Sequence, residues 1–197
     1  MVKLLFFLLR GYGLTWLRSA LRERQIRVQI PVTPFNMKIN KSFFKPKARI
    51  IAKRLIGKII SYKNLAGIII ETEAYEDDEA SHAFKRTERS SLMYNSYGRF
   101  YIYFVYGNYY CLNITTDEKG PGAVLIRALK PTKGISLMKK RRNCDDAKNL
   151  LNGPGKICQA FDINKKLNGS LINDKIKILD NNTKFKIENS SRIGIKK

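Results

Sequence analysis

The chain has 197 residues, of which 38 are Lys or Arg and 16 are Asp or Glu, so its formal net charge is +22 at pH 7. With 44% hydrophobic residues, a chain of this length can bury a core, which argues against wholesale disorder. The positive charge favours a polyanionic partner, nucleic acid first and a membrane surface second, over an acidic small molecule or protein.

Residues 1–36 have no pattern with a clear chemical role. Residues 4–9 form an apolar run that is too short to span a membrane and shorter than the usual core of a signal peptide. Residues 14–27 combine Leu and Trp with several arginines, which also suits a basic amphipathic helix. Because Met37 begins a second plausible start, we expect residues 1–36 to be an extension outside the fold and residues 37–197 to be one domain.

Hydrophobic periodicity predicts most elements of that domain. It predicts a helix over 46–56, strands over 58–62 and 67–75, a hairpin of strands over 99–105 and 109–115, and a further strand over 124–129. Helical patterns follow over 134–142, 145–151 and 154–161, and short strands over 176–179, 185–187 and 191–195. This alternation predicts an α+β or mixed α/β fold in a single domain, with a shortened C-terminal strand.

Two carboxylates share one face of the predicted strand over 67–75. Because successive side chains of a strand point to opposite faces, Glu71, Glu73 and Tyr75 lie on the same one. They follow an apolar run, so this strand end suits a general base with an aromatic ring beside it. A strand end capped by solvated glutamates explains the same pattern equally well.

The predicted hairpin is rich in aromatic residues. Tyr101 and Tyr103 share one face, which can offer phenols to a groove or pocket, although ordinary sheet packing is the simpler explanation. Tyr106 stands in the turn, where burial is hardest. An aromatic ring at such a loop tip of a basic protein is suited to stacking on nucleic-acid bases or inserting between them.

Arg127 lies inside the apolar strand over 123–129. A guanidinium there costs free energy unless an anion meets it, and Glu71 or Glu73 is the expected partner. Such a pair keeps the glutamate ionised near pH 7, and an ionised base beside a cation can hold and orient a water molecule. A structural ion pair is compatible with the same pattern.

Cysteine and histidine usage does not support a metal site. Cys111, Cys144 and Cys158 are odd in number and far apart, so neither a disulfide scaffold nor a zinc site is indicated, and a reducing cytosol suits them best. The single histidine, His82, cannot anchor a histidine-rich metal site.

Taken in order, these segments resemble the alkyladenine (3-methyladenine) DNA glycosylases, also called methylpurine-DNA glycosylases. The resemblance spans 48–195 and rests on LIGK at 55–58, ETEAY at 71–75, SH at 81–82, YIYFVYG at 101–107, CLNI at 111–114, LIRAL at 125–129 and GPGKICQA at 153–160. It implies a curved antiparallel sheet with surrounding helices and a protruding hairpin that inserts into DNA.

The resemblance also implies an activity, namely base excision repair of double-stranded DNA that contains damaged purines. Family members flip alkylated or deaminated purines (3-methyladenine, 7-methylguanine, hypoxanthine, ethenoadenine) out of the duplex and hydrolyse the N-glycosidic bond. They use water, without a lysine Schiff base, a metal or any cofactor. We therefore expect a monomer in the cytoplasm, associated with the nucleoid and without stable membrane insertion.

The resemblance assigns the hydrolysis step to three positions. Glu73 is expected to be the general base on the attacking water. Arg127 is expected to be a second group that holds this water, and the main-chain carbonyl of Ile193 a third.

Five further positions are expected to handle the base. Tyr75 matches the ring stacked on one face of the flipped purine, with His82 and Tyr103 on the other. Asn113 resembles the residue on the pocket floor whose amide crowds the 2-amino group of guanine. Tyr106 resembles the wedge that fills the gap left in the DNA stack.

Two features depart from the family pattern. Three residues follow Gly194, where the family continues into a terminal strand, and residues 1–36 match nothing in it. One alternative is therefore a non-catalytic nucleic-acid-binding protein that has this fold in decayed or truncated form. A second alternative is a membrane-surface protein that uses residues 1–30.

Overall fold

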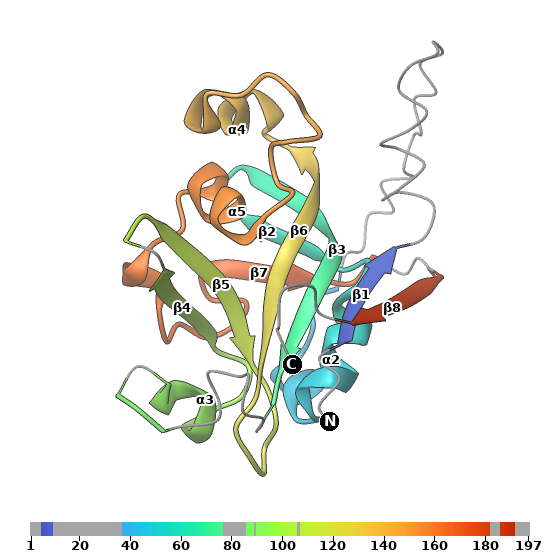
Figure 1. Ribbon diagram of the computed structural model, residues 1–197, viewed down its shortest axis with the longest axis vertical. Helices are drawn as coiled ribbons and strands as arrows, with labels where there is room; N and C mark the ends of the chain where they lie inside the picture. The colour runs from blue at the N-terminus through green and yellow to red at the C-terminus, as the bar shows by residue number, and fades with distance from the viewer. Residues whose placement is uncertain are drawn as a thin grey trace.

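An antiparallel sheet forms the centre of the computed structural model, which describes residues 5–9, 37–76, 86–88, 90–105, 107–181 and 186–191 (Figure 1). Its eight strands are β1 (Leu5–Leu9), β2 (Ile59–Tyr62), β3 (Leu65–Tyr75), β4 (Phe100–Val105), β5 (Tyr109–Thr115), β6 (Ala123–Lys133), β7 (Ile176–Leu179) and β8 (Ile187–Ser191). The order is β4-β5-β6-β3-β1-β8, and β2 joins β3 to β7. The predicted curved antiparallel sheet is thereby confirmed.

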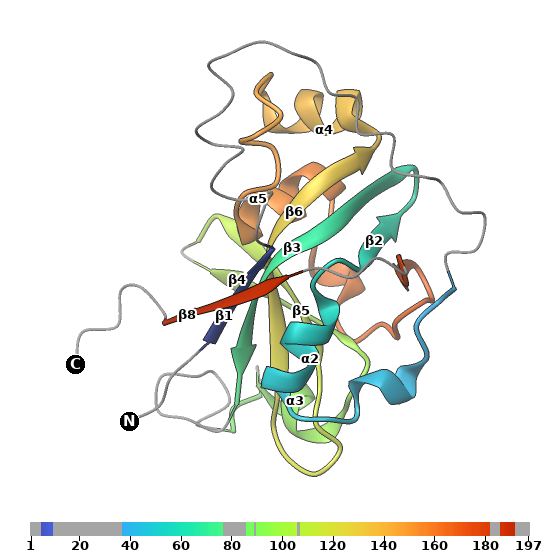
Figure 2. The same cartoon turned by 90° about the vertical axis from the view of Figure 1, so that its right-hand side faces the viewer.

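The described helices lie around this sheet. They are α2 (Ala48–Leu55), α3 (Ser91–Asn95), α4 (Ile135–Arg142) and α5 (Pro154–Phe161), with short 3-10 helices η1 (Lys41–Phe44) and η2 (Lys165–Leu167). Helix α2 buries Ala48, Ile51, Ala52 and Leu55, which recur at the spacing of one helical face. Figure 2 shows this helix lying beside β3, which it contacts together with β6.

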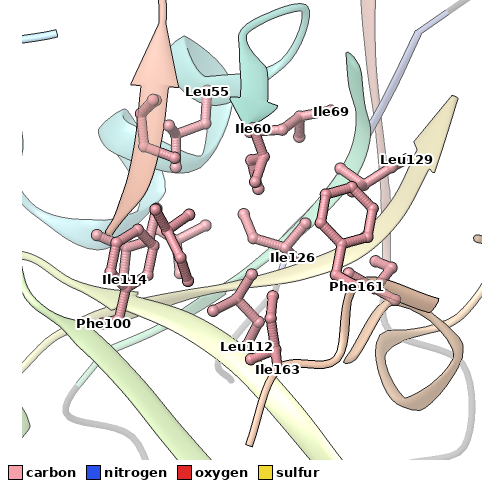
Figure 3. Packing of buried hydrophobic residues seen from close by; sticks show 14 of the residues in the cluster. Leu55, Ile60, Ile69, Phe100, Leu112, Ile114, Ile126, Leu129, Phe161 and Ile163 are labelled. Atoms are coloured by element: carbon pink, nitrogen blue, oxygen red, sulfur yellow. The ribbon is translucent and has the colours of Figure 1, made fainter. Parts of the chain in front are cut away.

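One face of the sheet packs against α2 and α5 to form the main core. Side chains of β5 and β6 meet Leu55 of α2 and Phe161 of α5 there, and Figure 3 shows Leu112 and Ile126 among them. The opposite face carries a second, smaller apolar cluster, which is made of Tyr75, Met93, Tyr101, Tyr103, Cys111, Ala123 and Leu125. The sheet therefore separates a structural core from a face that is rich in tyrosine.

The predicted helix over 145–151 is wrong. The segment forms a turn, in which the Asp146 side chain accepts hydrogen bonds from the main-chain nitrogen of Lys148 (2.9 Å) and the amide of Asn149 (2.7 Å). An aspartate that bonds its neighbours in this way competes with helix formation. The apolar residues that follow still reach the core, because Leu150 and Leu151 are buried.

The two ends of the chain differ in how far they match the expectations. β1 is not predicted by the sequence pattern, and it lies in the sheet between β3 and β8, whereas residues 1–36 were expected outside the fold. Residues 1–4 and 10–36 lie outside the described residues, so for them the extension stays a prediction. Near the other end, β8 occupies 187–191, while the expected strand over 191–195 falls mostly on residues that are not described.

Candidate functional site

The register of four neighbouring strands sets up the tyrosine-rich face. Tyr101 pairs with Asn113, Asn113 with Leu125, and Leu125 with Glu73. Directly opposed residues of an antiparallel pair point to the same face, so these four side chains form one row across the sheet. Segments that are far apart in the sequence thus come together on one surface.

Arg127 enters this surface at an irregularity between β3 and β6. The register passes from Glu71 paired with Ala128 to Thr72 paired with Ile126, which skips Arg127, and a second shift lies between Ile69 and Glu71. Bulges of this kind bend a strand and re-aim a side chain, and they are common beside active sites. The paired irregularities therefore set where the Arg127 side chain meets β3.

The guanidinium of Arg127 lies between two carboxylates. Its Nη1 donates a hydrogen bond to Oε2 of Glu73, and its Nε lies 3.4 Å from Oε1 of Glu71. The Glu73 side chain is 0% exposed, whereas those of Arg127 and Glu71 are 32% and 26% exposed. Burial raises the pKa of Glu71, Arg127 opposes that shift, and Glu73 adds to it. The predicted ion pair is confirmed, and it involves both glutamates.

Tyrosines occupy the part of the face next to this ion pair. Tyr75 and Tyr103 are both buried, and the ring centroids of Tyr101 and Tyr103 lie 5.2 Å apart. Burial raises the pKa of the Tyr103 hydroxyl, and the neighbouring Tyr75, which shares a side-chain hydrogen bond with it, adds to the rise. The Tyr103 phenol therefore stays neutral at physiological pH, and it offers an uncharged, electron-rich ring.

Asn113 lies in the row between Tyr101 and Leu125, and its side chain is held in place from two sides. Its Nδ2 donates to the main-chain oxygens of Tyr101 (3.0 Å) and Cys111 (3.3 Å). Its Oδ1 is buried and has no hydrogen-bond partner among the described residues. An amide that is fixed in this way can accept a hydrogen bond from a ligand.

Thr72 holds the opposite side of the same strand. Its side chain is buried on the α2 side, and its Oγ1 donates to the main-chain oxygen of Ala52 at 3.0 Å. Ala52 lies in the last turn of α2, where helical carbonyls begin to lack partners within the helix. The alternation Glu-Thr-Glu thus fixes β3 to α2 on one face and presents two carboxylates on the other.

The hairpin of β4 and β5 carries exposed aromatic residues toward its tip. Phe104 and Tyr109 are 46% and 50% exposed, and Phe104 packs on Tyr110 with ring centroids 4.9 Å apart. At the first turn of α5, a Cβ added to Gly155 would lie 3.0 Å from the Tyr109 ring. The hairpin therefore rests on α5 and still exposes large apolar side chains.

Comparison with known proteins agrees with this arrangement. The family model described as methylpurine-DNA glycosylase matches residues 42–197. The chain belongs to that family. Curated proteins of Prosthecochloris aestuarii and Clostridium novyi, each named "Putative 3-methyladenine DNA glycosylase", are each 42% identical to it, over 81% and 80% of this chain and 83% and 87% of their own lengths.

The site positions expected for a methylpurine-DNA glycosylase can now be located in the structure. The structure brings Glu73, Arg127, Tyr75, Tyr103 and Asn113 onto one face of the sheet. The other three positions, His82, Tyr106 and Ile193, lie outside the described residues.

Sequence reasoning missed the contribution of α3 to this face. Met93 is fully buried in the tyrosine cluster, and Leu92 packs against it. A helix of five residues is too short to show a hydrophobic period, so its sequence gives no signal that could have found it.

Within the part of the chain that the structure describes, no group of three His, Cys, Asp or Glu residues is placed to hold a metal ion. Among the same residues, no helix has the length and apolar character needed to cross a membrane.

Proposed function

We propose that this protein is a monofunctional DNA glycosylase that removes alkylated or deaminated purines from duplex DNA. The observation that carries the proposal is the buried Glu73 carboxylate, paired with Arg127, on the same face as Tyr75 and Tyr103. An ionised base at the edge of an aromatic surface is what hydrolysis of a bond to a bound aromatic base requires. The curated relatives are named for 3-methyladenine, which supports an alkylated purine as a substrate.

In the proposed reaction Glu73 accepts a proton from water. The water oxygen bonds to C1′ of the deoxyribose, and the purine leaves with the electron pair of the N-glycosidic bond. Arg127 pairs with Glu73 and helps to hold the water, and we assign the main-chain carbonyl of Ile193 as a third holder. The negative charge of Glu73 also stabilises the oxocarbenium character that develops on the sugar.

The tyrosines are proposed to bind the flipped base. Alkylation at N3 or N7 makes a purine cationic, and electron-rich rings attract such a cation over their faces. Tyr75 is assigned to one face of the base, with His82 and Tyr103 on the other. Asn113 is assigned to the pocket floor, where its fixed amide distinguishes the exocyclic groups of purines. The proposed substrates are 3-methyladenine, 7-methylguanine, hypoxanthine and ethenoadenine.

Contact with the duplex is assigned to the hairpin and to the excess positive charge. Tyr106 is proposed to occupy the gap left by the flipped nucleotide, between strands that already expose Phe104 and Tyr109. The net charge of +22 suits a phosphate-binding surface, and affinity for DNA is expected to fall steeply as salt is added. We propose that the protein acts as a monomer in the cytoplasm, with the nucleoid.

A single-turnover excision assay tests the proposal. Duplex oligonucleotides that each carry one lesion from the proposed set are mixed with excess protein, and base release is followed over time. The wild-type protein should release at least one of these bases, and Glu73→Gln should lose at least about a hundredfold in rate because it removes the base. Glu118→Gln, which removes an equal charge from an exposed loop, is the control.

Two results would contradict it. Wild-type protein that binds duplex DNA and releases no base would favour the alternative, a non-catalytic nucleic-acid-binding protein. A Glu73→Gln variant that cleaves at the wild-type rate would remove Glu73 from the proposed role.

A further inference from the structure

We propose that Glu71 is a positioning residue for the hydrolysis reaction, which it assists by holding the Nε edge of Arg127 and sharing its positive charge with Glu73. This inference rests on the proposed function, and it adds a residue that has no role in the reaction as described above.

The two edges of the Arg127 guanidinium face different carboxylates. A guanidinium has two usable edges, and here Nη1 is directed to Glu73 while Nε lies 3.4 Å from the Glu71 carboxylate. An arginine side chain is long, and on its own it can adopt several rotamers. A carboxylate at Nε selects the one in which Nη1 faces Glu73.

The charge of Glu71 acts on both members of the Arg127–Glu73 ion pair. The carboxylate of Glu71 faces Arg127 on β6 and Glu73 on its own strand, and these are the two charged groups that act on its pKa. Beside Glu71, the strand that pairs with the other edge of β3 is β1, whose sequence Leu-Phe-Phe-Leu-Leu has no ionisable side chain. An ion pair restricted to Arg127 and Glu73 would stabilise the Glu73 anion strongly and weaken it as a base. Sharing the cation with Glu71 leaves Glu73 a better proton acceptor.

The ionised carboxylate of Glu71 destabilises the folded state. Burial raises the pKa of this carboxyl, so its ionised form is less favourable in the folded protein than in water. A residue that served only to stabilise the sheet would not be a half-buried carboxylate next to another carboxylate. Its placement is better explained by the reaction than by the fold.

Nuclear magnetic resonance tests the contact without any substrate. The Nε–H signal of Arg127, assigned by its absence in Arg127→Lys, should exchange slowly with solvent in the wild-type protein. In Glu71→Ala its exchange should become faster on the order of tenfold, because the acceptor is lost. In Glu71→Gln the amide oxygen still accepts, so most of the protection should remain. Glu118→Gln should leave the exchange unchanged.

Single-turnover excision at a series of pH values tests the effect on the reaction. Glu71→Ala should reduce the rate on the order of a hundredfold, and Glu71→Gln, which restores the acceptor without its charge, on the order of tenfold. In Glu71→Gln the acid limb of the pH–rate profile should also move to lower pH, because the carboxyl of Glu71, whose pKa burial raises, no longer titrates. A purely structural role would leave that limb in place.

The outcomes are separable. Wild-type exchange of the Arg127 Nε–H in Glu71→Ala, or an acid limb that stays in place in Glu71→Gln, would overturn the assignment of Glu71. Absence of excision by the wild-type protein would overturn the proposed function instead, and the exchange measurement would still decide whether Glu71 holds Arg127.

Discussion

Replacing Arg127 with Met isolates the energetic role of the ion pair. Met has a similar length and no charge, so the change removes the cation that pairs with the fully buried Glu73 and leaves Glu71 on the same face. A buried carboxylate that loses its cation pays the desolvation cost without compensation. We therefore expect Arg127→Met to lower the free energy of unfolding at neutral pH.

The structure sets the size of the loss. Removing one partner of a buried pair costs about 3–5 kcal/mol. The side chains of Arg127 and Glu71 are 32% and 26% exposed, so water reaches one side of the cluster and reduces the cost. We expect about 2–3 kcal/mol, which for a domain of this size lowers Tm by about 4–12 °C.

Urea unfolding followed by circular dichroism measures this loss, with Arg127→Met/Glu73→Gln as the matched control. The double variant has no buried charge at Glu73, so it should regain most of the lost stability. An equal loss in the double variant would show that lost packing, and not the uncompensated charge, sets the stability of Arg127→Met.

Three further predictions concern the elements around the site. Because the folded-state pKa of Glu71 is raised, its contribution to stability declines as the pH rises above its ordinary value of 4.5; Glu71→Gln should therefore be more stable than wild type in urea at pH 7 and equal to it near pH 3. Thr72→Val, which removes the hydrogen bond to the Ala52 carbonyl, should cost about 1–2 kcal/mol in the same assay, and an unchanged value would show that this bond contributes nothing. Gly134 has φ of +78°, and a Cβ there would lie 2.8 Å from the main-chain oxygen of Asn64, so Gly134→Ala should lower stability by about 1–3 kcal/mol; a wild-type melting curve would contradict that.

Local sequence patterns predict which residues share the face of the site, because successive side chains of a β-strand point to opposite faces. The period of two places Glu71, Glu73 and Tyr75 together on β3, and the same period places Tyr101 and Tyr103 together on β4. An arginine within an apolar strand requires an anion, so the ion pair is also predictable. Each of these inferences needs only the chemistry of one residue and its nearest neighbours in the chain.

Long-range pairing is what the sequence could not predict. Nothing in the apolar run that contains Leu5–Leu9 indicates that it pairs with β3, because such a run is equally compatible with a strand or a helix. The shift in register that skips Arg127 depends on two strands far apart in the chain. That shift explains why Arg127 meets both glutamates, where the sequence predicted a choice between them.

Strand β3 therefore serves the fold and the site through alternate residues. On the α2 side, Thr72 is fully buried and bonded to the helix, which fixes the strand where a change of position would open the core. On the opposite side, the Glu73 carboxylate is equally buried, and its ion pair with Arg127 stabilises it there. The rigidity that the core gives to β3 holds Glu73 in place for the proposed reaction, because a base on a packed strand has little freedom to turn away from its water. Mutations on the α2 face of the sheet should consequently change the rate of the proposed reaction on the opposite face, because they shift the position of β3.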